Sequence, residues 1–345
     1  MKKLRVLVLV HDVLVPPPNA EELDPEDTWA YQMELDVQST LTALGHEVKV
    51  FGVEGDLNPV KTMIGSFKPD IVFNIITDFH DVITYEAHFV SYLELLKQPY
   101  TGCNPRGMVL AGDKGLSKKI LRHEGVPVPD FAVFPRRTRA TRLPAGMKYP
   151  VIVKAATKHG SAGISQASIV RTDKQLQRRV QFMHRTQKDD VVVEEFVEGR
   201  ELTVSIVGNE RLTVFPVWEV WYSKLPKGSK AIAEARVKWD VEYAQGIGYK
   251  TGEARKLDPK KVKRIQDIAR RAYRALDLSG YARVDLRMSE AGEVFVIEVN
   301  TNADLTAIED FAEAAEAVGH DYGDLLEMII QAGLSYEPAW KRVRR

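Results

Sequence analysis

Four side chains that could carry out chemistry together lie in one short stretch of the chain, Gly280–Thr306. Alternating apolar residues predict two strands there, joined by a Ser-Glu-Ala-Gly turn, so the stretch is expected to form a hairpin. The first strand carries Arg283 and Asp285. Glu298 and Asn300 stand two residues apart on the second strand, which places their side chains on the same face. Two carboxylates and a carboxamide are hard oxygen ligands of the kind that Mg²⁺ or Mn²⁺ prefers.

An exposed sheet that carries ordinary solvated residues is the alternative interpretation of this pattern. The positions flanking the polar residues are strongly apolar, which predicts a buried sheet. Unpaired carboxylates are costly in such a sheet because burial removes their hydration. We therefore favour a metal site on the hairpin.

The composition of the whole chain limits the classes of function. Its 345 residues are enough for roughly two or three domains. Lys+Arg and Asp+Glu both number 48, so no global field favours nucleic acid or a membrane surface. The lone Cys103 excludes an internal disulfide framework and a cysteine-based zinc cluster. With no signal-peptide pattern and no apolar run of about 18 residues, we expect a cytoplasmic protein that contacts neither nucleic acid nor membrane.

The first third of the chain alternates strands and helices, and this alternation predicts a doubly wound domain over residues 1–107. A loop with three consecutive prolines fills residues 11–27. Leu35, Leu41 and Leu44 are expected on one flank of the first helix. The predicted strands are 4–10, 48–53 and 71–76, and the predicted helices are 28–44 and 80–97.

A second module begins at Asp113 and Lys114, where a helix is predicted. A strand then ends in Lys154 and is followed by a loop that contains the run Gly160-Ser161-Ala162-Gly163. The backbone N–H groups of such a loop can wrap phosphate oxygens. Taken alone, the loop fits a plain hairpin turn equally well. The two lysines beside it suit a polyphosphate and favour the phosphate interpretation.

Glutamates around the next predicted strand, 191–196, indicate a pocket for a nucleotide base and ribose. Glu194 and Glu195 lie on the strand and Glu201 follows it. A carboxylate accepts hydrogen bonds well from ribose hydroxyls. An edge strand with ordinary surface glutamates is an equally good interpretation of these residues alone.

The region after this strand is predicted to contain more strands, over 202–220, and then a long irregular stretch. That stretch covers 221–252, includes Lys238 and is a candidate active-site loop. Residues 257–276 have the pattern of a basic amphipathic helix, whose lysines and arginines are expected to face solvent.

Eight motifs stand in one order along the chain, and together they resemble the ATP-grasp superfamily and, within it, the D-alanine–D-alanine ligase family. The resemblance covers almost all of residues 99–326. The motifs are Pro99-Tyr100-Thr101-Gly102, Asp113-Lys114, Gly125-Val126-Pro127-Val128-Pro129, Pro150-Val151-Ile152-Val153-Lys154, the loop of residues 160–163, Val193-Glu194-Glu195-Phe196-Val197-Glu198-Gly199-Arg200-Glu201, Ala282-Arg283-Val284-Asp285 and Glu298-Val299-Asn300-Thr301.

The resemblance implies an α/β (α+β) fold of the ATP-grasp type. A Rossmann-like N-terminal domain is expected over 1–107, a small central lid over 108–188, and a C-terminal mixed-sheet catalytic subdomain over 189–345. ATP would be held between the last two. Because the family commonly forms homodimers through its N-terminal domain, a homodimer is expected by the same analogy.

The resemblance also assigns roles by position. It implies that Arg283 is the catalytic arginine that stabilises the tetrahedral intermediate. It implies two Mg²⁺ ions, with Mn²⁺ as an alternative, held by Asp285, Glu298 and Asn300. The ATP-binding residues that it implies are the phosphate lysines Lys114 and Lys154, the phosphate loop Gly160, Ser161, Ala162 and Gly163, the adenine hinge Glu194, Glu195, Phe196 and Val197, the ribose carboxylate Glu201, and Lys238 as a further phosphate lysine.

The implied chemistry joins two small-molecule substrates, a carboxylate and an amine. The substrate carboxylate attacks the γ-phosphate of ATP, and positive groups neutralise charge on the phosphoryl oxygens. An amine then attacks the acyl phosphate, and Arg283 stabilises the oxyanion that forms. The products are ADP, phosphate and an amide.

The clearest departure from the family lies at the end of the hairpin stretch. D-alanine ligases have Asn-x-x-Pro-Gly-Met-Thr where this chain has Asn300 to Thr306, so Asp304 replaces the glycine that helps to hold the second amino acid's carboxylate. Glu309 and Asp310 replace the family's Ser-Leu pair. A carboxylate about 4 Å from another is repelled by about 1 to 4 kcal/mol. These three acids argue against a free amino-acid carboxylate in that pocket.

The N-terminal region departs as well. The family's Gly-Gly-x-Ser-x-Glu loop, which binds the ammonium group of the first amino acid, is absent. Glu26 is a weak substitute at a similar distance before Gly45, and the phosphate loop is one residue short. We therefore expect an ATP-dependent carboxylate–amine ligase whose acceptor is not D-alanine. A genuine D-alanine–D-alanine ligase with an atypical pocket, a non-catalytic ATP-binding regulatory protein and a kinase that stops at the acyl phosphate are the alternatives.

Overall fold

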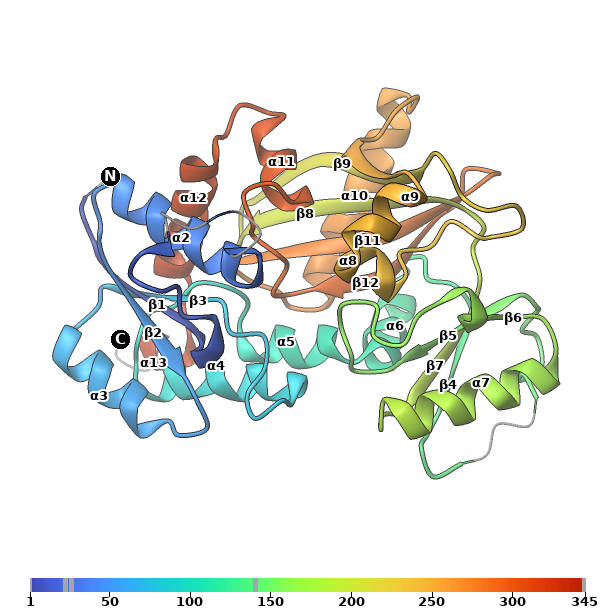
Figure 1. The fold of residues 1–345 in the computed structure, drawn as a ribbon, viewed down its shortest axis with the longest axis horizontal. Helices are drawn as coiled ribbons and strands as arrows, with labels where there is room; N and C mark the ends of the chain where they lie inside the picture. Colours follow the sequence, from blue (N-terminus) through green and yellow to red (C-terminus); the bar gives the residue numbers. More distant parts are fainter. Residues whose placement is uncertain (1, 21–23, 25–27, 139–141, 343–345) are drawn as a thin grey trace.

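The computed structural model describes residues 2–20, 24, 28–138 and 142–342, without the side chains of Lys238 and Trp239. Its strands form three sheets, with the orders β2-β1-β3, β4-β7-β5-β6 and β10-β9-β8-β11-β12. In Figure 1 the three-stranded sheet lies at the left, the four-stranded sheet at the lower right, and the five-stranded sheet above it.

The three-stranded sheet is parallel and is covered on both faces, as the doubly wound pattern predicted. Val6, Val8 and Val10 pack into a core shared with α2 and α12, whereas Leu7 and Leu9 face a core shared with α3 and α4. These elements are β1 (Arg5–His11), β2 (Glu47–Val53), β3 (Ile71–Asn74), α2 (Gln32–Ala43), α3 (Asn58–Phe67), α4 (Glu86–Leu95) and α12 (Tyr322–Ser335), with short 3₁₀ turns η1 (Asp12–Leu14), η3 (Trp29–Tyr31) and η4 (Ile83–Tyr85).

Helix α2 buries Glu34, Val37 and Leu41. Of the leucine flank named above, Leu41 is therefore buried, whereas Leu44, the residue after the helix, is 42% exposed. The buried stripe follows the spacing i, i+3, i+7 and includes a carboxylate, which hydrophobicity alone does not reveal.

The four-stranded sheet is antiparallel and packs one face against α7. It follows α5, which runs from the three-stranded sheet toward the four-stranded sheet in Figure 1. The expected boundary at 107 falls inside α5, and β7 joins this sheet although it follows the expected boundary at 188, so the domain limits stay predictions. The elements are α5 (Pro105–Gly112), α6 (Lys114–His123), β4 (Phe131–Phe134), β5 (Val151–Ala155), η5 (Gln166–Ser168), β6 (Ile169–Val170), α7 (Asp173–Thr186) and β7 (Val191–Glu195).

The five-stranded sheet contains the predicted hairpin, formed by β11 and β12. The basic helix α10 packs an apolar face on this sheet, with Ile265, Ala269 and Ala272 fully buried. The elements are β8 (Gly199–Gly208), β9 (Leu212–Tyr222), β10 (Tyr249–Glu253), α10 (Pro259–Ala275), β11 (Tyr281–Ser289), β12 (Val294–Asn300), α11 (Asp310–Glu316) and α13 (Ala339–Arg342).

The stretch 221–252 is less irregular than predicted. It contains the short helices α8 (Ala235–Trp239) and α9 (Val241–Gly246) and the edge strand β10. The Asp240 side chain accepts a hydrogen bond from the N–H of Tyr243 and so begins α9. Among the described residues, no helix has the length and apolar character that crossing a bilayer requires.

The segment Pro99-Tyr100-Thr101-Gly102 joins the three-stranded sheet to the hairpin. Thr101 N–H donates to Val72 O and its hydroxyl accepts from Asn74 N–H, which extends the edge of β3. Gly280 precedes β11 with φ +70°, and a Cβ there would lie 2.1 Å from the carbonyl oxygen of Gly102. The close approach of these two backbones therefore requires glycine at position 280.

We predict that Gly280→Ala lowers the free energy of unfolding by about 3 kcal/mol, because it adds a steric clash to the strain of a left-handed backbone. Urea unfolding measures the change. Gly319→Ala is the matched control, since Gly319 also has a positive φ (+87°) but a Cβ there meets nothing within 4 Å. Equal losses in the two variants would contradict the role of the clash.

Candidate active site

The register of β11 and β12 brings the four residues of the hairpin together. Arg283 pairs with Asn300 across the strands, and Asp285 pairs with Glu298. Arg283 donates to both oxygens of Asp285, at 2.8 Å and 3.1 Å, and Asn300 Nδ2 donates to Asp285 Oδ2 at 2.9 Å. Burial alone would lower the pKa of Arg283, but the carboxylate of Asp285 outweighs burial and raises it. Arg283 is therefore a permanent cation.

Glu298 faces two basic side chains from the central part of the chain. Lys114 Nζ lies 3.0 Å from Glu298 Oε1, and His159 Nδ1 lies 3.2 Å from the same oxygen. Burial would raise the pKa of Glu298, but Lys114 and His159 outweigh burial and hold that pKa well below its usual value. The carboxylate is therefore ionised.

The donor set of the hairpin fits a hard cation. Asp285 and Glu298 are cross-strand neighbours whose side chains are 24% and 19% exposed, and the carboxamide of Asn300 touches Asp285. Among the described residues, no group of three or more His, Cys, Asp or Glu side chains could hold a metal. A site here consequently depends on the amide oxygen of Asn300 as the third donor.

A buried cluster of charges lies where the four-stranded sheet meets α6. We call this sheet the central sheet, because it belongs to the central part of the chain. Glu194 is 1% exposed and its carboxylate is shared by two ammonium groups. Lys154 from β5 contacts Glu194 Oε1, and Lys118 from α6 lies 2.8 Å from Glu194 Oε2. Burial would raise the pKa of Glu194, but the two lysines outweigh burial and lower it. Lys118 was not predicted, although it stands one helical turn after Lys114 on the same helix face.

The predicted phosphate loop is a loop in the structure, between β5 and η5. Gly160, Ser161 and Gly163 all have positive φ, at +65°, +60° and +69°. Arg179 from α7 donates to Gly163 O and, at 2.7 Å, to Ser168 Oγ. Lys114 Nζ donates to Lys158 O at 2.6 Å and so holds the start of the loop.

The predicted adenine hinge covers the last two residues of β7 and the two residues after it, and two of its N–H groups are engaged within the protein. Glu195 N–H donates to Asp130 O at 2.8 Å, and Phe196 N–H donates to Pro150 O at 2.9 Å. These two groups extend the sheet and are not available to a base, which leaves the N–H of Val197 as the donor at the exposed end of the hinge.

Arg287 organises the hinge from β11 and was not predicted. It donates to Val197 O at 2.7 Å, to Glu201 Oε2 at 3.0 Å and to Ala231 O at 3.0 Å, and its guanidinium lies 5.0 Å from the ring centre of Phe196. Its alternation with Arg283 and Asp285 along the strand was a signal available in the sequence.

A loop that precedes α8 is fastened to the end of the phosphate loop. Gln166 accepts from Lys230 N–H at 2.9 Å, donates to Lys230 O at 3.0 Å, and donates to Glu234 Oε1 at 2.5 Å. Lys230 also pairs with Glu198. Lys238 lies on α8, but its side chain is outside the described part of the structure.

The predicted acceptor residues that the structure describes lie between the end of β12 and the start of α11. Asp304 is exposed, and its Oδ1 accepts from the N–H and the hydroxyl of Thr306, at 2.9 Å and 2.6 Å. Glu309 precedes α11 and Asp310 begins it. The charges of Asp310 and Asp304 both act on Arg283, so these two acids lie near that arginine. Glu26 lies outside the described residues.

Two buried carboxyl groups beside these acids were not predicted. Burial is the main reason why the pKa of Glu34 on α2 rises to about 7, and the charges of Asp304 and Asp36 add to it. Burial also raises the pKa of Glu86 on α4 to about 7, although His159 and Asn302 oppose the rise. The sequence signal for Glu34 was its place on the i, i+3, i+7 stripe of its helix.

Comparisons with known proteins identify the family. The family model described as "D-ala D-ala ligase C-terminus" matches residues 120–331. The D-alanine–D-alanine ligase of Desulforudis audaxviator (strain MP104C) is 36% identical over 246 residues, which cover 69% of this chain and 74% of that one. The chain belongs to the D-alanine–D-alanine ligase family. It is an ADP-forming ligase of the ATP-grasp type, as the sequence motifs predicted.

Solved structures show that the ligase has the ATP-grasp fold. The crystal structure of the D-alanine–D-alanine ligase from Bacillus anthracis complexed with ATP superposes with a TM-score of 0.73 at 21% identity, covering 99% of this chain and 98% of that one. The VanG D-Ala:D-Ser ligase from Enterococcus faecalis gives 0.69 at 18% identity, covering 95% and 99%. The family model begins at residue 120, so the N-terminal third, where the family's substrate loop is absent, lies outside it.

We predict that Glu34 makes the stability of the folded ligase depend on pH. A carboxyl whose pKa is raised from 4.5 to about 7 binds its proton more tightly in the folded state, so it contributes stability that is lost as the pH rises through this window. Glu34→Gln should therefore be more stable than wild type by about 2 kcal/mol at pH 8 and equally stable at pH 4.5. Chemical unfolding at both pH values measures the difference.

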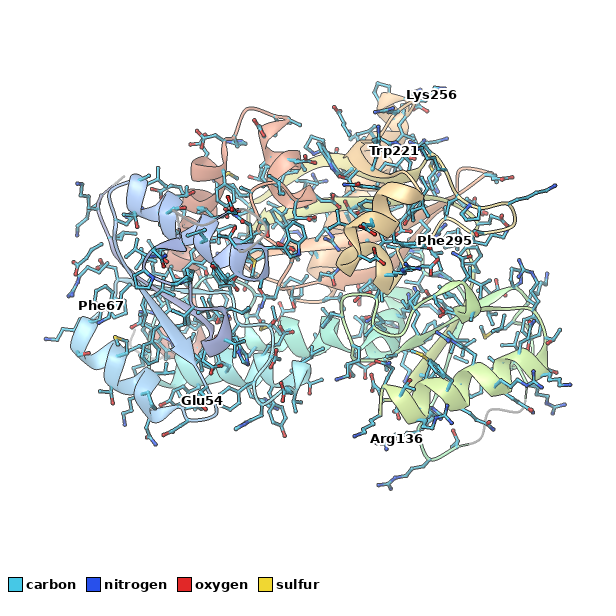
Figure 2. The ribbon with its side chains drawn as sticks, in the orientation of Figure 1. Glu54, Phe67, Arg136, Trp221, Lys256 and Phe295 are labelled. Carbon is cyan, nitrogen blue, oxygen red and sulfur yellow. The ribbon has the colours of Figure 1, made fainter. Side chains whose placement is uncertain are left out.

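The control for this comparison is Glu54→Gln, because Glu54 is exposed and lies at the outer edge of the N-terminal region (Figure 2). It should leave the stability unchanged at both pH values. A Glu34→Gln variant that is less stable than wild type at pH 8 would contradict the assignment of a buried carboxyl with a raised pKa.

Proposed function

We propose that the ligase joins a small-molecule carboxylate to an amine through an acyl phosphate, and that the acceptor amine is not D-alanine. The observation that carries this proposal is the arrangement of Arg283, Asp285, Glu298 and Asn300 on one face of the β11–β12 hairpin. An arginine fixed beside two carboxylates is of use to a protein that stabilises an oxyanion, and a protein that only senses ATP does not need it.

ATP is expected to lie between the central sheet and the five-stranded sheet. Lys114, Lys154 and the loop of residues 160–163 would contact its phosphates, because they supply two ammonium groups and a run of backbone N–H groups. Val197 N–H would contact the base and Glu201 the ribose. Glu194 is buried between two lysines, so its part is to orient Lys154.

Asp285, Glu298 and Asn300 would hold Mg²⁺, as two ions in our proposal with Mn²⁺ as an alternative, and the bound metal would neutralise charge on the phosphoryl oxygens. In the structure Asp285 pairs with Arg283, and Glu298 contacts Lys114 and His159.

The reaction follows from these positions. A carboxylate oxygen of the first substrate forms a bond to the γ-phosphorus as the bond to ADP breaks. The neutral amine then attacks the carbonyl carbon of the acyl phosphate, the Arg283 guanidinium stabilises the oxyanion, and phosphate leaves as the amine nitrogen loses its proton. The Gln166 contacts with the 230–234 segment would hold water away from the acyl phosphate.

The acidic residues around the proposed acceptor pocket favour an acceptor amine that carries no carboxylate close to its nitrogen. Asp304 and Asp310 act electrostatically on Arg283, and Glu34 is buried close enough to Asp304 to feel its charge. An acceptor carboxylate would meet repulsion from these groups, whereas an ammonium or another cation would be attracted. A homodimer formed through the N-terminal domain is part of the same proposal by family analogy.

A D-alanine–D-alanine ligase with an atypical pocket is the second candidate, and the relatives named as D-alanine–D-alanine ligases favour it. ADP release over a panel of carboxylates and amines separates the two. Turnover with D-alanine as sole substrate, at a rate matching the best alternative pair, would overturn the first proposal. Hydroxylamine trapping without amide formation would identify instead a kinase that stops at the acyl phosphate.

We predict that Arg283→Ala lowers kcat for ADP release by about 10²- to 10³-fold with the best substrate pair, because the oxyanion loses its principal charge partner. The dissociation constant for Mg-ATP should be measured alongside, because Arg283 also pairs with Asp285, a proposed metal ligand, and a loss in kcat at saturating Mg-ATP isolates its effect on the oxyanion. Steady-state kinetics and calorimetry measure the two quantities. Arg106→Ala, which removes an exposed arginine, is the control, and an unchanged kcat in Arg283→Ala would refute the role.

We also predict that Asp304→Asn changes acceptor preference. The variant keeps the oxygen that accepts from Thr306 but removes the negative charge. The ratio of kcat/KM for D-alanine to that for an amine without a carboxylate should rise by about tenfold. Asp321→Asn is the matched control, because Asp321 caps α12 through the same kind of contact. A ratio that is the same in all three proteins would show that Asp304 does not select the acceptor.

A further inference from the structure

Lys118 is a large, fully buried side chain with a charged group, and the proposed reaction assigns it no role. It lies on α6, one turn beyond Lys114, and its side chain is 1% exposed. Its ammonium group has three contacts: Glu194 Oε2 at 2.8 Å, Ile297 O at 2.7 Å and Val296 O at 3.5 Å. Burial of an ammonium group at this depth is costly, and its pKa is lowered by burial while Glu194 opposes the change.

The contacts of Lys118 join the two halves of the proposed nucleotide site. Glu194 lies on β7 of the central sheet, next to Lys154 on β5, whose ammonium group it also holds. Val296 and Ile297 lie on β12 of the five-stranded sheet, immediately before Glu298. One ammonium group thus contacts the partner of the phosphate lysine and the strand that carries a proposed metal ligand.

We propose that Lys118 is a positioning residue for ATP: by sharing the carboxylate of Glu194, it leaves Lys154 with net positive charge for the phosphates and fixes β12 against the central sheet. This inference rests on the proposed placement of the ATP phosphates beside Lys154. It assigns Lys118 no contact with the nucleotide itself.

The charge balance of the cluster is the physical reason. Lys118, Lys154 and Glu194 together carry a net charge of +1 in a buried place, so an approaching polyphosphate meets a cation. Without Lys118, Glu194 and Lys154 would form a one-to-one neutral pair, and the phosphates would have to compete with a buried carboxylate for Lys154. A carboxylate alone could orient Lys154, but it would also cancel the charge that the phosphates need.

The alternative is that Lys118 only fills space in the core. Buried ion pairs can often be replaced by neutral groups of similar volume without loss of stability, so burial by itself does not reveal a functional part. The two possibilities differ in their consequences for ATP binding. If charge sharing matters, neutralising Glu194 should repair the loss of Lys118, because Lys154 then regains its free charge.

The test is calorimetric binding of Mg-ATP to the full chain without acceptor, with thermal unfolding as a second readout. Lys118→Gln removes the charge but keeps a hydrogen-bond donor toward Ile297 O, and we expect the dissociation constant to rise by about tenfold or more. In Lys118→Gln/Glu194→Gln it should be at least about threefold lower than in Lys118→Gln, because Lys154 no longer faces a carboxylate. Lys118→Arg should bind ATP nearly as well as wild type, since the charge is retained.

Lys119→Gln is the matched control, because Lys119 is the next residue on the same helix and is exposed. Lys118→Gln binding ATP within twofold of wild type, or a double variant that binds no better than Lys118→Gln, would overturn the inference. If Lys118→Gln does not fold, Lys118→Met replaces it with the same two expected outcomes. A wild-type protein that binds no Mg-ATP would instead overturn the proposed function, so the two failures are distinguishable.

Discussion

The structure of the site depends on the pairing of one buried and two partly buried carboxylates with basic side chains, most of which come from other segments. Asp285 is matched by Arg283 on its own strand, but Glu298 is matched by Lys114 and His159, and Glu194 by Lys118 and Lys154. The partners of Glu298 come from α6 and the loop after β5, whereas Glu298 belongs to the five-stranded sheet. Removing one partner from a buried pair costs about 3 to 5 kcal/mol, because a lone charge remains. Charge matching therefore helps to fix how the central and five-stranded sheets meet.

The elements that the sequence predicted correctly are those whose burial pattern is local. Strand alternation identified β11 and β12, and helical spacing identified α10, because each pattern repeats within one element. The stretch 221–252 was misjudged for the opposite reason. Its helices are short, and contacts such as Gln166 with Lys230, 64 residues away, hold the segment that leads into them. Short helices have little stability of their own, so tertiary contacts decide them and no local pattern predicts them.

The same distinction explains which site residues the sequence revealed. Arg283, Asp285, Glu298 and Asn300 stand in a compact motif on a recognisable hairpin. Lys118 donates a hydrogen bond to Ile297, which is 179 residues away in the chain. Arg287 donates a hydrogen bond to Val197, which is 90 residues away. A lysine on a basic helix is normally solvated, so only the packing of α6 against β12 shows that this one is buried. Residue type and spacing can identify a chemical group, but burial and partners determine what it does.

The balance of charge differs between the two sides of the site, and this difference bears on what the ligase joins. On the nucleotide side each buried carboxylate has a cationic partner. On the acceptor side the charged groups that act on Glu34 are Asp304 and Asp36, both of them acids. Such a side disfavours a second carboxylate and favours a substrate that brings positive charge. These acids come from two parts of the chain, because Glu34 and Asp36 lie on α2 whereas Asp304 lies four residues after Asn300, inside the stretch that the family model matches. The acceptor preference that we propose would therefore be set both by the N-terminal region and by the end of the hairpin stretch.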